Sequence, residues 1–600
     1  MGGITSLYTG VSGLRSSQTA INTTSHNLVN VNTEGYVRQQ VVFTDTTYKN
    51  VSNNGLNAQK VGFGVNLQDI RRIRDILLDK AFRTETGRQS FYEEAFQAVD
   101  EIEGILGELD GVSFGTYLNE LWESVQEVEK DASSMVARSA LVQNAVTFIN
   151  RANAVYDGLI NYQSTLNTEV MNKVNRINEI GDSIDSLNKQ IMRIESTGVE
   201  SANDMRDQRD ELLDELSSLI RTEYVEEPTG MVRVRTEGVV FVDITGVNHM
   251  GYEMLDTEVG SDYFTPTWPE LGGRKVYNLE VEISTAKNND IGALKGLLLA
   301  RGNSAANYTD IPNSDDPKYQ LKDDNGDFLY NYEEDLDRYR RIIEPSVVKT
   351  VMAEFDMLIN SIVTQINNAL CPDISATDPD VGLTIGQTLT TADGKTITVT
   401  KDTLVLNTHY NDDAAGYGTD DDRTQGAELF SRDHTKRYIE CTDAAGNTYK
   451  VYNTINEFGL ESLYTLGNID INYDVLDNKD LLGLNTRDGA VDQKRASALA
   501  IQWDTPCLKL GPDYVSYDDF IEFYSEFTGQ IANAGDLYNN MINYQTSLAG
   551  GIDDQRTGIT GVSSDEELAY LIQYQNAYNA ASRYITVIDE MLEHIVTQLG

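Results

Sequence analysis

The two ends of the 600-residue chain carry apolar residues at alternating spacings of three and four. This spacing puts the residues on one stripe of a helix, and such a stripe pairs with another helix in a coiled coil. The N-terminal stripe comprises Ile4, Leu7, Val11, Leu14, Ile21 and Leu28. The C-terminal stripe comprises Leu571, Tyr574, Tyr578, Ala581, Ile585, Ile588, Leu592, Ile595 and Leu599. Both stripes need a partner, and the pattern alone fits an intramolecular bundle and an assembly of subunits equally well.

The same periodicity predicts further helices inside the chain. They are expected at 89–109, 114–130, 159–194, about 340–370 and 520–548. After a turn near 196–201, a shorter helix is predicted with Asn203 as its N-cap. Ser564 and Glu567 have the spacing of a capping box, which predicts the start of the C-terminal helix.

Two internal regions, 224–285 and 372–505, have the composition of β-structure. In the second region, strand-like segments flank turns at Asp393-Gly394 and Gly446, which is the pattern of β-hairpins. The sequence therefore predicts an α+β multidomain fold, in which both termini form a long helical coiled-coil stalk and β-rich domains are inserted in the middle. The expected segments are a terminal helix with the stretch that follows it (1–60), a helical stalk domain (61–223), a β-rich segment (224–290), a helical segment (291–371), a variable β-rich outer domain (372–505), a returning stalk helix (506–556) and a C-terminal helix (557–600).

Charge and composition exclude several classes of protein. The chain has 47 basic and 94 acidic residues, a net charge of −47, which disfavours binding to nucleic acid or to an anionic membrane surface. No apolar run approaches the ~18 residues that span a bilayer, and the N-terminus lacks the layout of a cleaved secretory signal. Cys371, Cys441 and Cys507 form no CxxC pair, so neither a zinc site nor a disulfide framework is predicted.

No segment predicts catalysis or metal binding. Residues 111–115 match the G-x-S-x-G nucleophile elbow, but a helical pattern precedes them, so Ser113 is interpreted as a residue near a helix N-cap. Residues 323–334 imitate a calcium loop but carry Phe328 where the sixth position needs glycine. The five histidines show no ligand spacing, and Asp207-Gln208-Arg209-Asp210 is interpreted as a solvated helix face. We therefore predict no catalytic, cofactor-binding or metal-binding residue, no cofactor and no enzymatic activity.

Strings at both ends resemble a known bacterial family. Residues 25–32 read Ser-His-Asn-Leu-Val-Asn-Val-Asn, and Gly35-Tyr36 and Arg38-Gln39 follow them. This is similar to the N-terminal signature of flagellar axial proteins, the rod, hook and hook-associated proteins, although Glu34 stands where that family usually has proline. Residues 561–567 and 574–581 resemble the C-terminal motif of the same family. Residues 61–65 are similar to the family's Gly-x-Gly-Val segment, and four more strings, at 36–39, 111–122, 203–212 and 291–298, resemble its hook-associated members in particular.

The resemblance implies a structural component of the flagellum at the junction between hook and filament. The implied partners are further copies of the chain in a ring at the hook tip, hook protein, the next hook-associated protein and a cytosolic export chaperone; nucleic acid and membrane insertion are not implied. The implied location is the extracellular flagellum, reached by type III export without a cleaved signal. Hook or distal rod protein is the alternative within the family, and an adhesive module at 372–505 is the alternative outside it.

The resemblance also assigns residues to assembly. The N-terminal set is Leu7, Val11, Leu14, Ile21, Asn27, Leu28, Asn30, Gly35, Tyr36, Arg38 and Gln39. The C-terminal set, which is also the expected chaperone site, is Leu571, Tyr574, Tyr578, Ile585, Ile588, Leu592, Ile595 and Leu599. Because a lone helix of this length is marginal in water, we expect both terminal segments to be disordered in the isolated subunit and to order at the growing tip.

Overall fold

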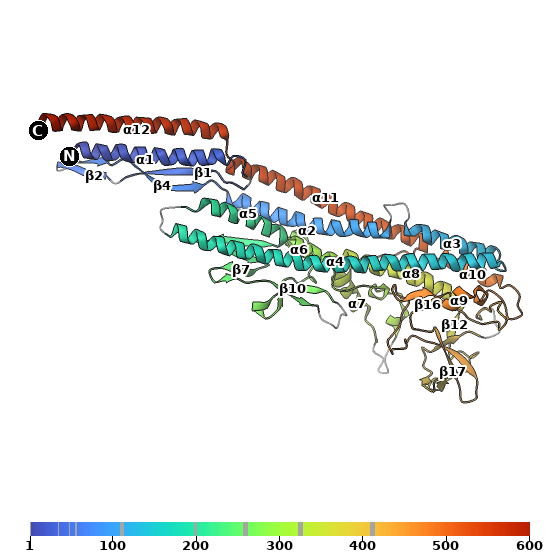
Figure 1. Cartoon of the computed structure of the whole chain (residues 1–600). Helices are drawn as coiled ribbons and strands as arrows, with labels where there is room; N and C mark the ends of the chain where they lie inside the picture. The colour runs from blue at the N-terminus through green and yellow to red at the C-terminus, as the bar shows by residue number, and fades with distance from the viewer. Residues whose placement is uncertain are drawn as a thin grey trace.

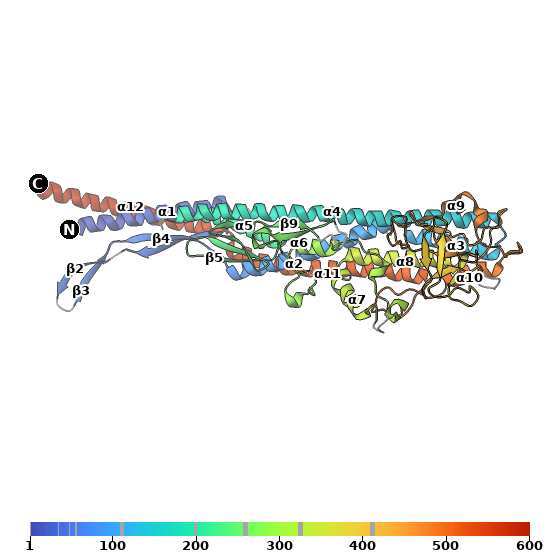
Figure 2. The same cartoon turned by 90° about the horizontal axis from the view of Figure 1, so that it is seen from below.

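The computed structural model describes residues 2–33, 35–46, 48–54, 57–107, 113–196, 201–255, 262–321, 328–408 and 414–599. The molecule is elongated, with both chain ends at one extremity and a β-rich region at the other (Figures 1 and 2). The chain leaves the terminal end along helices, forms the outer β-rich region, and returns along a second long helix. The predicted α+β architecture with helical termini and inserted β-structure is confirmed.

Long helices set the length of the molecule. The longest, α4, has 61 residues, or about 90 Å at 1.5 Å per residue. It begins well before the predicted residue 159, because apolar residues such as Leu141 and Phe148 continue its buried stripe toward the N-terminus. The helices are α1 (Gly2–Val29), α2 (Ile76–Leu106), α3 (Phe114–Lys130), α4 (Met135–Glu195), α5 (Asn203–Leu219), α6 (Ala293–Arg301), α7 (Tyr332–Arg338), α8 (Val347–Leu370), α9 (Tyr473–Asp477), α10 (Gln493–Trp503), α11 (Phe520–Thr560) and α12 (Ser564–Leu599).

The main core lies between α2, α3, α4, α8 and the first half of α11. Phe114 lies in this core, with ring centroids 5.3 Å from Phe148, 4.8 Å from Phe355 and 5.6 Å from Tyr524. These four aromatic residues come from four different helices, so the returning helix α11 is fixed to the helices that precede the outer region.

The strands of the first half of the chain form small antiparallel sheets beside the helices. They are β1 (Gln39–Asp45), β2 (Tyr48–Asn54), β3 (Asn57–Gly62), β4 (Val65–Arg72), β5 (Thr222–Glu226), β6 (Val232–Thr236), β7 (Val239–Asp243), β8 (Gly246–Val247), β9 (Gly251–Met254), β10 (Phe264–Trp268) and β11 (Arg274–Lys275). The sheet β5-β6-β7-β8 packs on α4, where a Cβ on Gly181 would lie 2.6 Å from Phe241. The predicted β-rich segment after α5 therefore forms a sheet that packs on α4.

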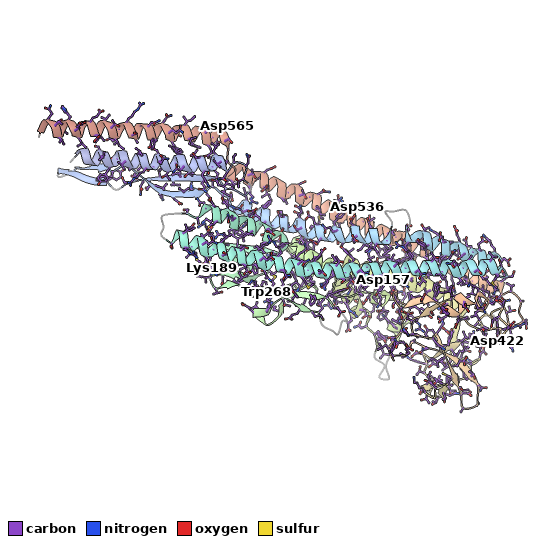
Figure 3. All side chains as sticks on the ribbon, viewed as in Figure 1. Asp157, Lys189, Trp268, Asp422, Asp536 and Asp565 are labelled. Carbon is purple, nitrogen blue, oxygen red and sulfur yellow. The ribbon has the colours of Figure 1, made fainter. Side chains whose placement is uncertain are left out.

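The outer region contains a six-stranded antiparallel sheet in the order β12-β15-β18-β17-β13-β14. Both predicted hairpins are present, and their glycines Gly394 and Gly446 have φ of 84° and 89°, which glycine adopts without strain. The strands are β12 (Asp373–Ser375), β13 (Thr388–Thr391), β14 (Thr396–Thr398), β15 (Leu404–Leu406), β16 (Phe430–Arg432), β17 (Tyr438–Thr442), β18 (Thr448–Tyr452) and β19 (Ile469–Ile471). Figure 3 shows Asp422 in this outer region and Asp565 where α12 begins, beside the end of α11.

Two predictions about element boundaries are wrong. The last part of 372–505 is helical, because α10 packs on α3, where Trp503 stacks on Trp122 with ring centroids 5.3 Å apart. The N-cap of α5 is Ala202, since Asn203 is already helical and donates its side-chain amide to the carbonyl oxygen of Ile70 at 2.9 Å.

Candidate assembly site at the two chain ends

The terminal helices α1 and α12 lie side by side, with the strands β1 and β4 beneath α1 (Figure 1). On α12 the predicted stripe lies on the most buried face, as the half-buried Leu571, Tyr574, Tyr578, Ile585 and Leu592 and the buried Ile588 show. Ile595, near the helix end, is half exposed at 51%. The side chain of Leu599 lies outside the described residues. The C-terminal stripe is therefore the face that meets α1.

The contact face of α1 is not the predicted leucine stripe. A Cβ on Gly10 would lie 2.7 Å from Ile585, and one on Gly13 would lie 3.7 Å from Ala581, so α12 approaches α1 over glycines. The buried residues of α1 with described side chains are Gly10, Ser16, Ser17, Ala20, Thr23, Thr24 and Asn27. The predicted Leu7, Val11, Leu14, Ile21 and Leu28 are only half-buried beside them. Small residues allow a closer approach of two helix backbones than leucines do. This explains why the contact face of α1 is shifted by about one residue from the predicted leucine stripe.

The strands hold α1 from the other side. The hydroxyls of Ser12 and Ser16 each donate to a backbone carbonyl oxygen, of Phe63 and Val65 respectively, at 3.4 Å. Gly64, which lies between Phe63 and Val65, has φ of 106°, and a Cβ on it would lie 2.0 Å from the Ser12 Oγ. Only glycine fits at this crossing, so the Gly-Phe-Gly string has a structural role.

The segment after α1 returns to the helix through Asn27. The Asn27 Oδ1 accepts hydrogen bonds from the Tyr36 hydroxyl at 2.7 Å and from the Gln39 backbone N–H at 3.0 Å. Its Nδ2 donates to the Gln39 carbonyl oxygen at 2.9 Å and to a Glu567 carboxylate oxygen at 3.1 Å. One buried amide thus connects α1, the start of β1 and α12.

Glu567 is the corresponding residue on α12. It is 2% exposed, and its other carboxylate oxygen accepts from the Arg38 Nε at 2.8 Å, while the Arg38 backbone N–H donates to the Thr560 carbonyl oxygen at 2.8 Å. The predicted capping box with Ser564 is wrong, because Ser564 is the first helical residue and the Glu567 carboxylate is bound to Asn27 and Arg38 instead. We call Asn27, Tyr36, Arg38, Gln39 and Glu567 the terminal clasp.

The turn between α1 and the clasp contains the other predicted residues of this segment. The Asn30 side-chain amide donates to the His26 carbonyl oxygen at 2.9 Å, and its Oδ1 accepts from the Thr33 hydroxyl at 3.1 Å. Gly35 has φ of 75°, the left-handed conformation that favours glycine. Residue 34, where proline was expected, lies outside the described residues. The segment therefore shapes the turn that brings Tyr36 back to Asn27.

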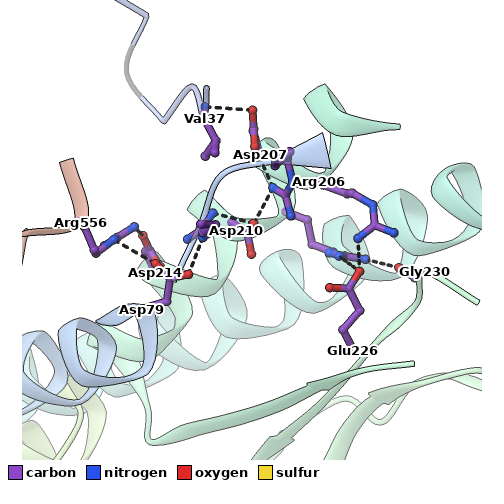
Figure 4. Close-up of polar contacts among 12 residues, drawn as sticks. Val37, Asp79, Arg206, Asp207, Asp210, Asp214, Glu226, Gly230 and Arg556 are labelled. Atoms are coloured by element: carbon purple, nitrogen blue, oxygen red, sulfur yellow. Dashed lines mark hydrogen bonds and ion pairs between the residues drawn. The ribbon is translucent and has the colours of Figure 1, made fainter. Parts of the chain in front are cut away.

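A network of buried arginines and aspartates joins the terminal clasp to the body of the molecule (Figure 4). Asp207 on α5 accepts from the Val37 backbone N–H at 3.2 Å and from the Arg72 Nη1 at 2.7 Å. Asp210 accepts from Arg72 at 2.8 Å and from Arg74 at 2.6 Å. The prediction of a solvated face at Asp207–Asp210 is wrong, since Asp207, Arg209 and Asp210 are all buried.

The end of α11 belongs to the same network. The Arg556 Nη2 donates to Asp214 at 2.8 Å, and its Nε lies 3.1 Å from Asp79 at the start of α2. We call Arg72, Arg74, Arg83, Arg556 and the aspartates 79, 207, 210 and 214 the joint. Sequence inspection misses the joint because Arg72 and Asp210 are 138 residues apart, and no local pattern predicts that they pair.

The two central aspartates of the joint differ in their ionisation. Burial raises the pKa of Asp207, although Arg72 beside it acts in the opposite direction. Burial also acts to raise the pKa of Asp210, but Arg74, Arg72 and Arg83 together hold it below its ordinary value. Asp210 is therefore the fixed negative charge around which the three arginines gather.

The motifs considered for other chemistry form no site. Ser113 occupies the N-cap position of α3, as expected, and makes no side-chain hydrogen bond there. In the described parts of the chain, no group of histidine, cysteine and acidic side chains is arranged to hold a metal ion. Residues 322–327 of the calcium-like loop lie outside the described residues. Among the helices of the described ranges, none has the long apolar stretch that crossing a bilayer requires.

Comparisons with known proteins agree with this placement of the site. Residues 99–325 match the model of the flagellar hook-associated protein FlgK helical domain. Residues 7–36 match the flagella basal body rod protein model, and residues 558–599 match the flagellar basal body rod FlgEFG protein C-terminal model. The two rod models therefore cover α1 and α12 together with most of the terminal clasp.

Relatives extend the similarity over the whole chain. Flagellar hook-associated protein 1 of Bacillus subtilis is 24% identical over 99% of this chain and 98% of its own length, and that of Salmonella typhimurium is 29% identical over 36% of this chain and 38% of its own. The solved structure of the flagellar hook junction protein FlgK from Burkholderia pseudomallei aligns over 82% of this chain and 100% of its own, at 14% identity and a TM-score of 0.46. The helical-domain model and the full-length relative together make this chain similar to flagellar hook-associated protein 1, a structural component of the bacterial flagellum, along its whole length.

Proposed function

We propose that the chain assembles into the hook–filament junction through its paired terminal helices. The faces of α1 and α12 that do not contact each other would bind neighbouring subunits. The observation that carries this proposal is a second apolar face on α12, turned away from α1. Its exposed residues are Leu568 (44%), Ile572 (59%), Val587 (47%) and Met591 (55%). An exposed apolar face of this kind on a long helix is typical of a protein–protein interface.

Disorder of the termini before assembly fits the composition of the contact between them. Because the fully buried face of α1 consists of glycine, alanine, serine, threonine and asparagine, α1 itself contributes little apolar area to the contact. The ordering of two long helices opposes this small gain, so stable pairing needs the further area that neighbouring copies cover. The described contacts therefore support a proposal in which the terminal helices become ordered only at the growing tip.

The partners proposed are further copies in a ring, hook protein on one side and the next hook-associated protein on the other. Before export, a cytosolic chaperone would cover the stripe Leu571–Leu592 that later meets α1. Export without a cleaved signal fits an α1 with one charged residue, Arg15, in 28, because such a segment has little charge to desolvate in a narrow channel.

The test replaces exposed apolar residues of α12 with aspartate. Val587→Asp and Met591→Asp should leave the circular dichroism spectrum and thermal unfolding of the purified chain unchanged, because neither side chain is buried. Both should prevent incorporation at the hook tip, measured by immuno-electron microscopy and by swimming of complemented cells. Val515→Asp, at an exposed apolar residue (93%) between α10 and α11, is the control and should assemble normally. Normal junctions from both apolar variants would refute the proposal.

A further inference from the structure

We infer that a stripe of apolar residues on α11 is the surface that each copy of the chain presents to the next copy beside it, where it packs against exposed apolar residues at β9. The inference rests on the proposed function and adds a contact in the body of the molecule, away from the terminal helices. Its elements are an uncharged helix face without a partner among the described residues, and a second apolar patch on the opposite edge of the same chain.

Helix α11 is covered on one side where it leaves the main core. On that side it packs on α2, where the ring centroids of Tyr538 and Tyr92 are 6.4 Å apart. Gln545 and Ala549 are the next buried residues on this side of the helix. The remaining sides of α11 between residues 537 and 552 are largely exposed, so this part of the helix has room for a second partner.

A second stripe of α11 lies beside the face that meets α2. It comprises Leu537, Met541, Tyr544 and Leu548, which are four, three and four residues apart and therefore lie on one line along the helix. Leu537 is 57% and Tyr544 is 62% exposed, Leu548 is exposed as well, and Met541 is half-buried. We call these four residues the α11 stripe. Contiguous exposed apolar residues of this kind mark sites of protein–protein interaction.

This part of α11 carries no charge. Residues 537–552 include no lysine, arginine, aspartate or glutamate, although 24% of the chain is charged. The long helix α4 is the contrast, because from Ala137 to Glu195, all of which the structure describes, it exposes no large apolar side chain. The core of an interface between proteins is depleted of charged residues, whereas a solvated helix face is rich in them. The α11 stripe therefore has the composition of an interface.

A second exposed apolar patch lies on the opposite edge of the body. Tyr252 and Met254 are exposed on β9, and Leu271 is exposed in the turn after β10. The turn lies against β9, since a Cβ on Gly251 would be 2.8 Å from Pro269. We call Tyr252, Met254 and Leu271 the β9 patch. In Figure 1, α11 runs along the upper edge of the molecule and β10, which pairs with β9, lies at the lower edge.

A second copy is the occupant that these two patches favour. Identical copies in a ring meet through a heterologous interface, in which one patch contacts a different patch on the next copy. The α11 stripe and the β9 patch lie on opposite edges of one chain and meet this requirement, whereas a foreign partner would need only one of them. Copies with a net charge of −47 repel each other, so a contact between them costs least where one surface carries no charge.

Acidic substitutions test the two patches. Tyr544→Asp should reduce incorporation at the hook tip about tenfold, because it places a charge in an apolar contact, and Met254→Asp should do the same from the other side. Neither should change the thermal unfolding of the purified chain, since both side chains are exposed. Tyr473→Asp, the same change at an exposed tyrosine of α9, is the matched control and should incorporate normally. Normal incorporation of either patch variant would overturn the inference.

Thiol cross-linking tests which surfaces meet. A chain with Tyr544→Cys and a second chain with Met254→Cys should form a mixed dimer with a short bifunctional thiol reagent when they are co-assembled. Each variant assembled alone should give none, and the unsubstituted chain, whose own cysteines are buried or half-buried, is the blank.

Two results would overturn the inference while leaving the proposed function intact. A dimer from the Tyr544→Cys chain alone would show that α11 packs on α11, and normal assembly without a mixed dimer would show that the two patches do not meet. Normal assembly of the Val587→Asp and Met591→Asp chains is the separate result that would overturn the function.

Discussion

Glu354 on α8 is a carboxyl group in the main core without a basic partner among the described residues. It is 1% exposed, its Oε1 accepts from the Gln530 Nε2 at 3.3 Å, and its Oε2 has no hydrogen-bond partner among the described residues. Burial raises its pKa well above the ordinary value, and Gln530 opposes this only in part. Burial therefore extends the pH range over which the folded chain keeps Glu354 protonated, relative to the unfolded chain.

This difference predicts a pH dependence of stability. Above pH 4.5 the unfolded chain loses the proton that the folded chain keeps, so stability falls as pH rises, by about 1.4 kcal/mol per pH unit, until the folded group ionises as well. Glu354→Gln removes this cost and should raise the unfolding temperature at pH 7, with the gain disappearing near pH 4. The measurement is calorimetry at several pH values, and Glu526→Gln, exposed on α11, is the control. An equal gain at both pH values would contradict the assignment.

The joint shows what the sequence does not predict at this scale. Asp207, Arg209 and Asp210 have the composition of a solvated helix face. The distant Arg72, Arg74 and Arg83 pair with the two buried aspartates, and Glu226 pairs with Arg209. By contrast, Asn27, Tyr36, Arg38 and Gln39 are recognisable by resemblance, and the structure brings all four together. Buried ion pairs between distant segments leave no periodic pattern, which is why inspection finds the clasp and misses the joint.

At the scale of elements, α1 and α12 differ in how well their contact faces are predicted. On α12 the large apolar residues make the contact, so periodicity identifies the face. On α1 the contact is made by small residues, of which Gly10 is the tightest, and hydrophobic periodicity gives them no weight. The half-buried leucines of α1 lie next to the contact. Their regular spacing therefore predicts a contact face that is shifted by about one residue from the observed one.

The glycines of α1 give a matched pair of substitutions. Gly13→Ala should stabilise α1 by about 1 kcal/mol through helix propensity, because its Cβ would meet Ala581 at an ordinary 3.7 Å. Gly10→Ala should lose that gain and cost about 1–3 kcal/mol, since its Cβ would lie 2.7 Å from Ile585 and force the helices apart. Hydrogen exchange of α1 in assembled junctions measures both. Equal protection in the two variants would contradict the close approach.

At the scale of the whole molecule, the described residues contain two separate hydrophobic cores. The larger follows the helices, and the smaller lies inside the outer sheet and comprises Ala376, Val381, Leu383, Leu389, Val399, Val405, Cys441 and Val451. The strands of the outer sheet are short, and its core has only these eight residues. The outer sheet is therefore a separate unit of stability carried by the helical body.

Two cores predict two unfolding transitions. Leu389→Ala, at a fully buried site in the outer sheet, should lower the stability of one transition by about 2–5 kcal/mol and leave the other unchanged. Leu358→Ala, fully buried in the helical core, is the matched substitution and should shift only the other transition. Differential scanning calorimetry distinguishes the two. A single transition that moves with either variant would show that the cores unfold together.

The terminal clasp bridges a separation of 540 residues, from Asn27 to Glu567. Synthesis proceeds from the N-terminus, so Asn27 cannot bind the Glu567 carboxylate until almost every other residue has been made. A chain that stops early, wherever it stops before residue 567, presents an α1 without its clasp. Only a copy synthesised past residue 567 can therefore form the complete terminal clasp.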